Sequence, residues 1–159
     1  MLHRGKPTVL HRGALTVLHR VAPWRTVATL VDSNVILDVV SDDAEWGDWS
    51  SSMLSKAAQA GRLVINPLIY AEVSCGYEEI EDLDAAVPPE YFVREPLPWE
   101  AAFLAAKAFV KYRRRGGSRA APLPDFYIGA HAALAGYTLL TRDARRYSTY
   151  FPKLQIIAP

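Results

Sequence analysis

Residues 27–38 read Val-Ala-Thr-Leu-Val-Asp-Ser-Asn-Val-Ile-Leu-Asp, and this stretch decides the fold. Its first five residues are apolar or β-branched, which is typical of a strand buried on both faces. Asp32 interrupts the run, and the pattern that follows predicts a helix over residues 33–40. A buried strand leading directly into a helix is the unit from which parallel α/β sheets are built.

The same alternation continues along the chain. Further strands are expected at residues 63–65, 91–94, 137–140 and 154–157, and helices at residues 47–60, 67–75, 78–86, 98–115 and 124–135. Asn66-Pro67 is a typical helix start, and Gly76 and Gly136 are placed to end helices. Strands that alternate with helices through short connections predict a doubly wound α/β domain, a parallel sheet with helices on both faces.

The composition of the 159-residue chain supports one globular domain. Apolar residues make up 50% of the sequence and charged residues 22%, which supplies a core and excludes a disordered or fibrous protein. The single cysteine, Cys75, excludes a disulfide-stapled scaffold and a cysteine-rich zinc module. No apolar run approaches the roughly 20 residues of a membrane span, so we expect a cytoplasmic protein.

Residues 1–26 differ from the rest of the chain. They hold five of the 18 Lys/Arg residues, three of the four histidines and none of the 17 acids, so residues 27–159 carry a formal charge of −4. Leu-His-Arg recurs at positions 2, 10 and 18. This basic leader is consistent with a repeated stretch of DNA read into a mis-assigned start, with a targeting peptide or with a basic arm for nucleic acid. We expect the domain itself to cover residues 27–159.

Three acidic residues are expected at one rim of the sheet. Asp32 directly follows the first strand, Asp143 lies three residues past the strand at 137–140, and Asp125 is in the first turn of the preceding helix. Ligands of such sheets bind outside the carboxyl ends of the strands. Glu72 is a lone acid inside a short apolar helix, where it needs a partner.

Each acid also has a purely structural interpretation. Asp32 and Asp143 are placed to cap helices, Asp125 suits the first turn of its helix, and Glu72 could face solvent. Together the acids favour a binding site, because converging carboxylates with no Lys or Arg between them repel one another. A hard cation such as Mg²⁺ or Mn²⁺ resolves that repulsion, and it also activates water against a phosphodiester.

Four motifs around these acids resemble those of the PIN-domain ribonucleases and, within them, the VapC-type toxins of type II toxin–antitoxin systems. They are LVDSNVILD (residues 30–38), IYAEV (69–73), LPDFYIGA (123–130) and LTRD (140–143). The similarity extends over residues 27–159. It implies a PIN-like three-layer α/β/α domain with a mostly parallel central sheet of about five strands flanked by helices.

The resemblance also implies a Mg²⁺-dependent endoribonuclease, with Mn²⁺ as a possible substitute. Asp32, Glu72, Asp125 and Asp143 would form the catalytic pocket. Asp32 and Asp125 would be the direct metal ligands, and Asp143 and Glu72 would complete the site directly or through water. Three neighbouring polar residues match positions that tune the site in the family: Ser33, Asn34 and Thr141.

Partners follow from the same resemblance. An antitoxin would occlude the acidic pocket, often with a basic side chain in place of the metal, and the chain would form a homodimer. RNA would be the substrate, and basic residues near the end of the longest helix could contact its phosphates: Lys111, Arg113, Arg114, Arg115 and Arg119. A solvated helix end explains these cations equally well.

Other functions fit the sequence less well. It contains no Ser-His-Asp set at recognisable spacing and no Gly-rich phosphate loop after the first strand, and His131, among alanines, is predicted to be structural. A receiver-like signalling domain would need an Asp ending its central strand and a Lys after a late strand, but the strand at 91–94 provides no such Asp and Asp143 follows the late strand. The remaining alternative is a non-catalytic RNA-binding module of the PIN type.

Overall fold

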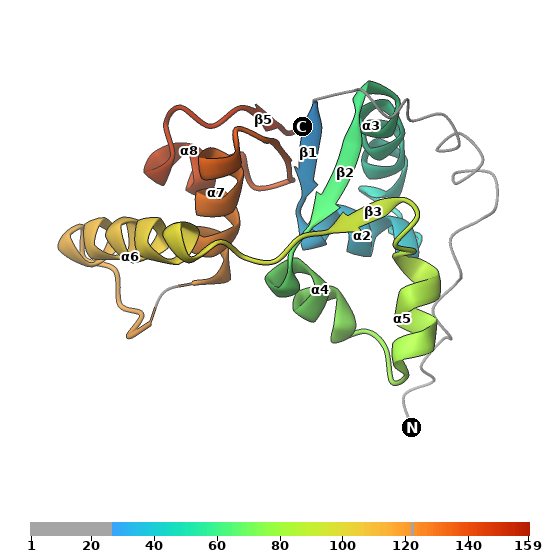
Figure 1. Ribbon diagram of the computed structural model, residues 1–159, viewed down its shortest axis with the longest axis horizontal. Helices are drawn as coiled ribbons and strands as arrows, with labels where there is room; N and C mark the ends of the chain where they lie inside the picture. The colour runs from blue at the N-terminus through green and yellow to red at the C-terminus, as the bar shows by residue number, and fades with distance from the viewer. Residues whose placement is uncertain (1–26, 122) are drawn as a thin grey trace.

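The strand predicted at the start of the domain forms the centre of the sheet. The computed structural model describes residues 27–121 and 123–159, so our predictions for the leader, residues 1–26, lie outside the described part. Five parallel strands lie in the order β3-β2-β1-β4-β5 (Figure 1). The predicted parallel sheet is therefore confirmed, and β1 (Ala28–Val31), with all four residues buried, occupies its middle.

The elements follow the predicted alternation. After β1 come α2 (Ser33–Val40), α3 (Gly47–Ala60), β2 (Arg62–Ile65), α4 (Pro67–Ser74), α5 (Ile80–Ala86), β3 (Phe92–Arg94), α6 (Trp99–Arg114), α7 (Pro124–Ala135), β4 (Thr138–Leu140), α8 (Ala144–Tyr150) and β5 (Ile156–Ile157). Asn66 caps α4 as expected, because its side-chain oxygen accepts hydrogen bonds from Leu68 N and Ile69 N, both at 3.1 Å. Gly136 ends α7 with a positive φ of 69°.

Four strands begin later than predicted: β1 by one residue, and β3, β4 and β5 beside turns. Tyr91 N donates to Pro88 O, Tyr137 N to Ala132 O and Leu154 N to Phe151 O. These turn hydrogen bonds commit the first predicted strand residues to the preceding turns. The helix predicted from residue 78 similarly begins at Ile80, with Glu79 as its N-cap residue.

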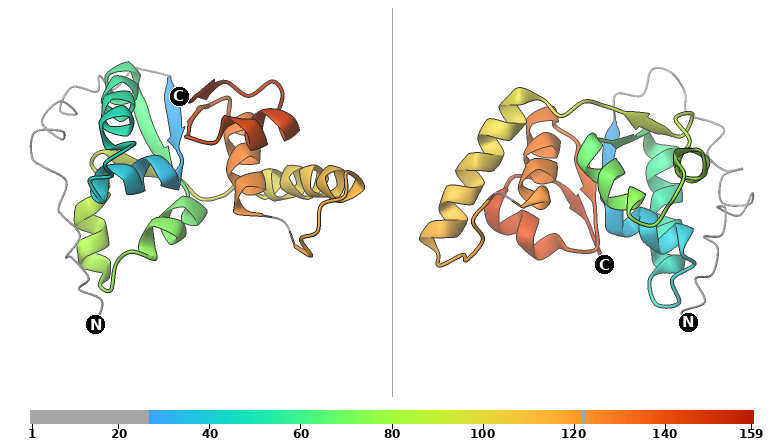
Figure 2. Two further views of the ribbon diagram at one scale, coloured as in Figure 1. Left: turned by 180° about the vertical axis from the view of Figure 1, so that it is seen from behind. Right: turned by 90° about the horizontal axis from the view of Figure 1, so that it is seen from below.

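Helices cover both faces of the sheet, which gives the predicted three layers. Helices α2 and α3 lie on one side of the strands, and α6, α7 and α8 lie on the other (Figures 1 and 2). Helix α4 lies beyond the carboxyl ends of β1 and β2, where it contacts both α2 and α7. The two groups of helices therefore come together at that end of the sheet. None of the described helices is long and apolar enough to cross a membrane.

Close packing between α7 and α8 depends on a glycine. A Cβ atom at Gly129 would lie 2.5 Å from Phe151 Cε2 and 3.0 Å from Tyr147 Cδ1. Both rings are buried, so neither can move into solvent. A Cβ at Gly47, in contrast, would meet only backbone atoms at an ordinary 3.7 Å.

We therefore expect Gly129→Ala to lower the free energy of unfolding by about 1–2 kcal/mol relative to Gly47→Ala, because overpacking outweighs the helix propensity that alanine adds. Urea unfolding of both variants and the wild type measures the difference. Equal stability of the two variants would contradict the packing argument.

Candidate active site

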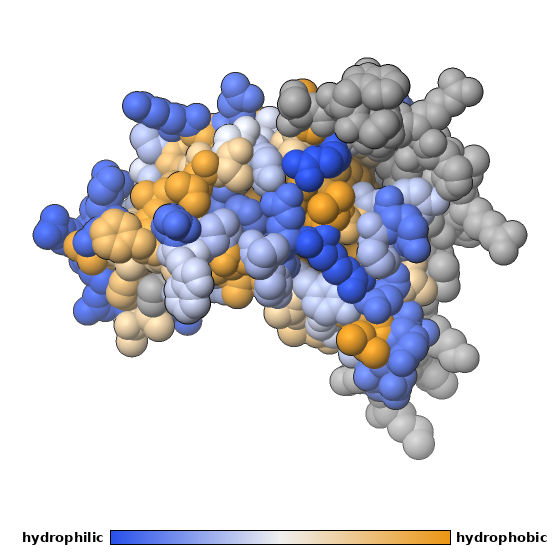
Figure 3. Space-filling model, viewed as in Figure 1, coloured by the Kyte–Doolittle hydropathy of each residue, from blue (hydrophilic) through white to orange (hydrophobic). Residues whose placement is uncertain are grey.

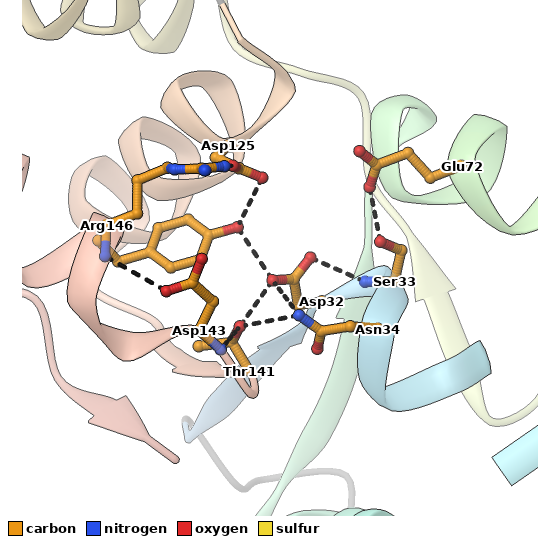
Figure 4. A network of polar contacts seen from close by, with 9 residues as sticks. Asp32, Ser33, Asn34, Glu72, Asp125, Thr141, Asp143 and Arg146 are labelled. Atoms are coloured by element: carbon orange, nitrogen blue, oxygen red, sulfur yellow. Dashed lines mark hydrogen bonds and ion pairs between the residues drawn. The ribbon is translucent and has the colours of Figure 1, made fainter. Parts of the chain in front are cut away.

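Asp32 lies at the centre of a cluster of acidic and hydroxyl side chains at the carboxyl end of β1, which we call the pocket, and only 3% of its surface is exposed. Its Oδ1 accepts a hydrogen bond from Ser33 N at 2.8 Å. Its Oδ2 accepts from Thr141 Oγ1 at 2.7 Å, Tyr147 OH at 3.0 Å and Asn34 Nδ2 at 3.2 Å (Figure 4). Burial raises the pKa of Asp32, and the hydrogen bonds from Thr141, Tyr147 and Ser33 oppose that rise. Asp32 therefore caps α2, as predicted, and its carboxylate lies in the pocket at the same time.

Backbone pairing explains why the first and fourth motifs meet. Asp32 N donates to Leu140 O at 2.9 Å, so the ends of β1 and β4 are held side by side. Asn34 strengthens the connection: its Nδ2 lies 3.3 Å from Thr141 Oγ1, and its Oδ1 accepts from Arg142 N at 3.2 Å. The structure therefore brings Asn34 and Thr141 together beside Asp32, as predicted.

Glu72 has a polar partner, as an acid in an apolar helix requires. It is half-buried on α4, and its Oε2 accepts a hydrogen bond from Ser33 Oγ at 2.7 Å. Burial raises the pKa of Glu72, and repulsion from Asp32 and Asp125 adds to the effect. The second motif therefore faces the same pocket as the first.

Asp125 differs from our expectation in its surroundings. Its Oδ1 accepts a hydrogen bond from Tyr147 OH at 3.4 Å, and its Oδ2 forms an ion pair with the guanidinium of Arg146. The prediction that no Lys or Arg would stand among the carboxylates is therefore wrong. The sequence did not predict this ion pair. Arg146 lies three residues after Asp143, and only the first turn of α8 brings its side chain back toward Asp125 (Figure 4).

Asp143 lies at the exposed edge of the pocket. Its Oδ1 accepts a hydrogen bond from Arg146 N at 3.5 Å, so it caps α8. Its own backbone N–H donates to Thr141 Oγ1 at 3.1 Å. Its carboxylate is therefore tied to the start of a helix, whereas its backbone N–H is connected with Asp32 through the Thr141 hydroxyl.

Tyr147 and Asp38 are further functional candidates that the sequence analysis did not single out. Tyr147 is 1% exposed, and its hydroxyl reaches both Asp32 and Asp125. Burial, and next the charge of Asp32, raise the pKa of this phenol, so it stays protonated and donates. Asp38 is buried on α2, where it accepts from Ser50 Oγ at 2.6 Å and lies 3.2 Å from Arg142 Nε. It therefore supports the segment that carries Thr141.

The donor chemistry of the pocket suits a hard cation. Its acidic side chains offer carboxylate oxygens, the ligands that Mg²⁺ and Mn²⁺ prefer, and their mutual repulsion contributes to the raised pKa values of Asp32 and Glu72. In the part of the chain that the structure describes, however, no three Asp, Glu, His or Cys side chains are grouped closely enough to hold a metal as they stand. A cation shared by Asp32 and Asp125 would have to enter beside the Tyr147 hydroxyl, which contacts both carboxylates, and it would compete with Arg146 for the charge of Asp125.

The predicted basic residues lie on the exposed end of α6 and the loop that follows it. Arg113 donates to Gly117 O at 3.1 Å and Arg119 O at 2.9 Å, and Arg115 lies over the Tyr150 ring at 5.7 Å. Two of the five cations therefore already have contacts within the chain.

His131 is structural, as predicted. It is 1% exposed, with Nδ1 3.2 Å from Asn66 Nδ2 and Nε2 3.6 Å from Glu95 Oε2. Because Asn66 caps α4 and His131 belongs to α7, this contact connects the helices that carry Glu72 and Asp125.

The raised pKa of Asp32 predicts a pH-dependent stability. The folded state holds the Asp32 proton more tightly than the unfolded chain does, so this residue favours folding at low pH and opposes it once it ionises. We expect Asp32→Asn, measured with EDTA present, to raise the thermal unfolding midpoint at pH 8 by about 2–4 °C. The gain should shrink toward pH 4.

Glu45→Gln is the matched control, because Glu45 is exposed and loses the same charge. Thermal melts followed by circular dichroism from pH 4 to pH 8 provide the comparison. If both variants followed the wild-type pH profile, the buried charge of Asp32 would not oppose folding.

Comparisons with known proteins agree with this fold. The sequence model described as "PIN domain" matches residues 29–152. The structure of VapBC2 from Rickettsia felis bound to a DNA fragment from their promoter is similar with a TM-score of 0.66, at 14% identity, over 84% of this chain and 99% of that one. VapBC-1 from nontypeable Haemophilus influenzae is similar with a TM-score of 0.63 at 16% identity, over 83% of this chain and 98% of that one. FitAcB from Neisseria gonorrhoeae is similar with a TM-score of 0.59 at 18% identity, over 82% of this chain and 97% of that one.

No curated protein matches the chain. The identities to the solved structures are low, so those structures support the fold alone. The family match, in contrast, spans most of the sequence and all four acidic motifs. The chain therefore belongs to the PIN-domain family.

Proposed function

We propose that this protein is a metal-dependent endoribonuclease that acts as the toxin of a toxin–antitoxin pair. The observation that carries the proposal is the meeting of Asp32, Glu72 and Asp125, from three separate segments, in one pocket where their charges repel. Asp143 borders the same pocket. A pocket built only for stability would not place Asp32 and Glu72 where their ionisation opposes folding.

In this proposal, Asp32 and Asp125 hold Mg²⁺ or Mn²⁺, with Asp143 and Glu72 completing the site directly or through water. The bound cation would polarise the scissile phosphate and lower the pKa of an attacking water. Thr141, Tyr147 and Asn34 fix the Oδ2 atom of Asp32, and Ser33 fixes Oε2 of Glu72. The raised pKa of Glu72 suits it to accept a proton from that water.

We further propose an antitoxin as the partner that occludes the pocket in the cytoplasm. The support is the likeness in fold to proteins whose structures are VapBC and FitAB complexes, together with the charge of −4 on residues 27–159. An acidic pocket attracts a basic segment of a partner, and a partner in that position would exclude RNA. The exposed cations on α6 and the loop after it would help attract the RNA itself.

A homodimer through α6 is part of the same proposal. Trp99, Phe103 and Val110 are 89%, 66% and 42% exposed, and their spacing places them along one side of the helix. Over α6, on the left of Figure 3, apolar side chains lie among hydrophilic ones. Glu100 is near one end of this stripe and Lys107 and Arg114 are toward the other, so an antiparallel second copy would bring opposite charges together.

The nuclease proposal predicts metal-dependent cleavage of RNA. Wild type, Asp32→Asn, Asp125→Asn and the control Glu81→Gln, an exposed acid on α5, are incubated as full chains with a panel of structured RNAs. The incubations contain Mg²⁺, Mn²⁺ or EDTA. We expect wild type and Glu81→Gln to cleave only with metal, and the two pocket variants to lose at least about 100-fold in rate.

Each alternative gives a different result. RNA binding without cleavage by the wild type, under every condition, would favour the non-catalytic RNA-binding module. Cleavage that survives both EDTA and Asp32→Asn would come from a contaminating nuclease. The receiver-like hypothesis gains no support from the family match.

The dimer proposal predicts that Phe103→Glu shifts the molar mass from dimer to monomer, because it places a charge in the apolar stripe. Size-exclusion chromatography with light scattering measures this, with Glu81→Gln as the control. A wild-type monomer would contradict the proposal, and so would a Phe103→Glu dimer.

A further inference from the structure

The two carboxylate oxygens of Asp125 have different partners. Oδ1 faces the Tyr147 hydroxyl and, through it, Asp32, whereas Oδ2 is held by the Arg146 guanidinium (Figure 4). Arg146 comes from α8 and Asp125 from α7, so the pair connects two elements at the pocket. Among the described residues, it is the only ion pair that one of the four predicted acids makes with a Lys or Arg side chain.

This ion pair balances charge that would otherwise be unfavourable. Burial raises the pKa values of Asp32 and Glu72, and repulsion from Asp125 adds to the rise in both. The positive charge of Arg146 offsets part of that repulsion, and its hydrogen bond to Asp125 in turn raises the pKa of the guanidinium. Arg146 thus does in the folded chain what a bound cation would do.

Arg146 and a divalent cation compete for the negative charge of Asp125, although Arg146 contacts Oδ2 and a cation shared with Asp32 would approach Oδ1. Their like charges repel at this short range, so each weakens the binding of the other. The Arg146 side chain is 46% exposed, so it can move into water at small cost. The ion pair can therefore loosen when a cation binds, and the cost of loosening it lowers the affinity for the cation.

We propose that Arg146 is a positioning residue that acts as the internal counter-cation of the pocket. Its positive charge competes with a divalent cation for Asp125, and it thereby raises the cation concentration at which the site fills. This inference rests on the proposed metal-dependent function, since it concerns how the site receives its metal. It predicts that removing the guanidinium strengthens metal binding.

The test measures Mn²⁺ binding without RNA. Metal-free full-length wild type, Arg146→Gln, Arg146→Lys and Arg145→Gln are titrated with Mn²⁺ by isothermal calorimetry. Arg145 is the matched control, because it is exposed on the same turn of α8 and its loss changes the net charge equally. We expect Arg146→Gln to lower the Kd for Mn²⁺ by about three- to fivefold, as for loss of one partly exposed ion pair.

Arg146→Lys keeps the positive charge but loses the planar fork of donors, so its Kd should lie between those of wild type and Arg146→Gln. Arg145→Gln should remain close to wild type. Circular dichroism melts of all four proteins would show whether each is folded during the titration.

Three results would overturn the inference: an unchanged or weaker Mn²⁺ affinity in Arg146→Gln, an equal gain in Arg145→Gln, or no binding by any folded variant. RNA cleavage reports separately on the nuclease. A protein that cleaves RNA with metal but binds Mn²⁺ equally well in wild type and Arg146→Gln retains its proposed function and loses this inference. Tighter Mn²⁺ binding in Arg146→Gln without any RNA cleavage would support this inference and contradict the proposed nuclease function.

Discussion

Burial of the Asp32 carboxylate at the end of β1 is the constraint on which the rest of the pocket depends. An ionised carboxylate that leaves water without hydrogen-bond partners is destabilising by several kcal/mol. Here the partners come from the start of α2, the residue after β4 and the interior of α8. Satisfying one charge therefore fixes the start of α2 against the end of β4 and against α8, which both come more than 100 residues later in the sequence.

The same constraint creates a tension between stability and chemistry. Hydrogen bonds to Asp32 reduce the penalty of burial without removing it, because its pKa remains raised. Glu72 repeats the pattern with Ser33 as its partner. The pocket therefore contains carboxylates whose negative charge is unfavourable, as expected of a site that binds a cation. The ion pair of Arg146 with Asp125 offsets part of that charge.

The sequence alone predicted the order of strands and helices and the rim at which the acids meet. Those features depend on local patterns: β1 is a continuous apolar run, and Asp32 stands directly after it. The contributions of Arg146 and Tyr147 could not be predicted from local sequence patterns, because they depend on how α8 turns back toward α7. The strand beginnings were also missed, since Tyr137 and Leu154 pair with preceding turns although their side chains suit strands.

The glycine between α7 and α8 connects packing with the chemistry of the site. Gly129 lies one helical turn after Asp125, and it leaves room for the ring of Tyr147, whose hydroxyl joins Asp125 to Asp32. A side chain at residue 129 would therefore press on the ring of Tyr147, whose hydroxyl lies between the carboxylates of Asp32 and Asp125, without contacting either carboxylate. Residue 129 is thus a place from which a conditional, temperature-sensitive form of the protein could be made with all four acids intact.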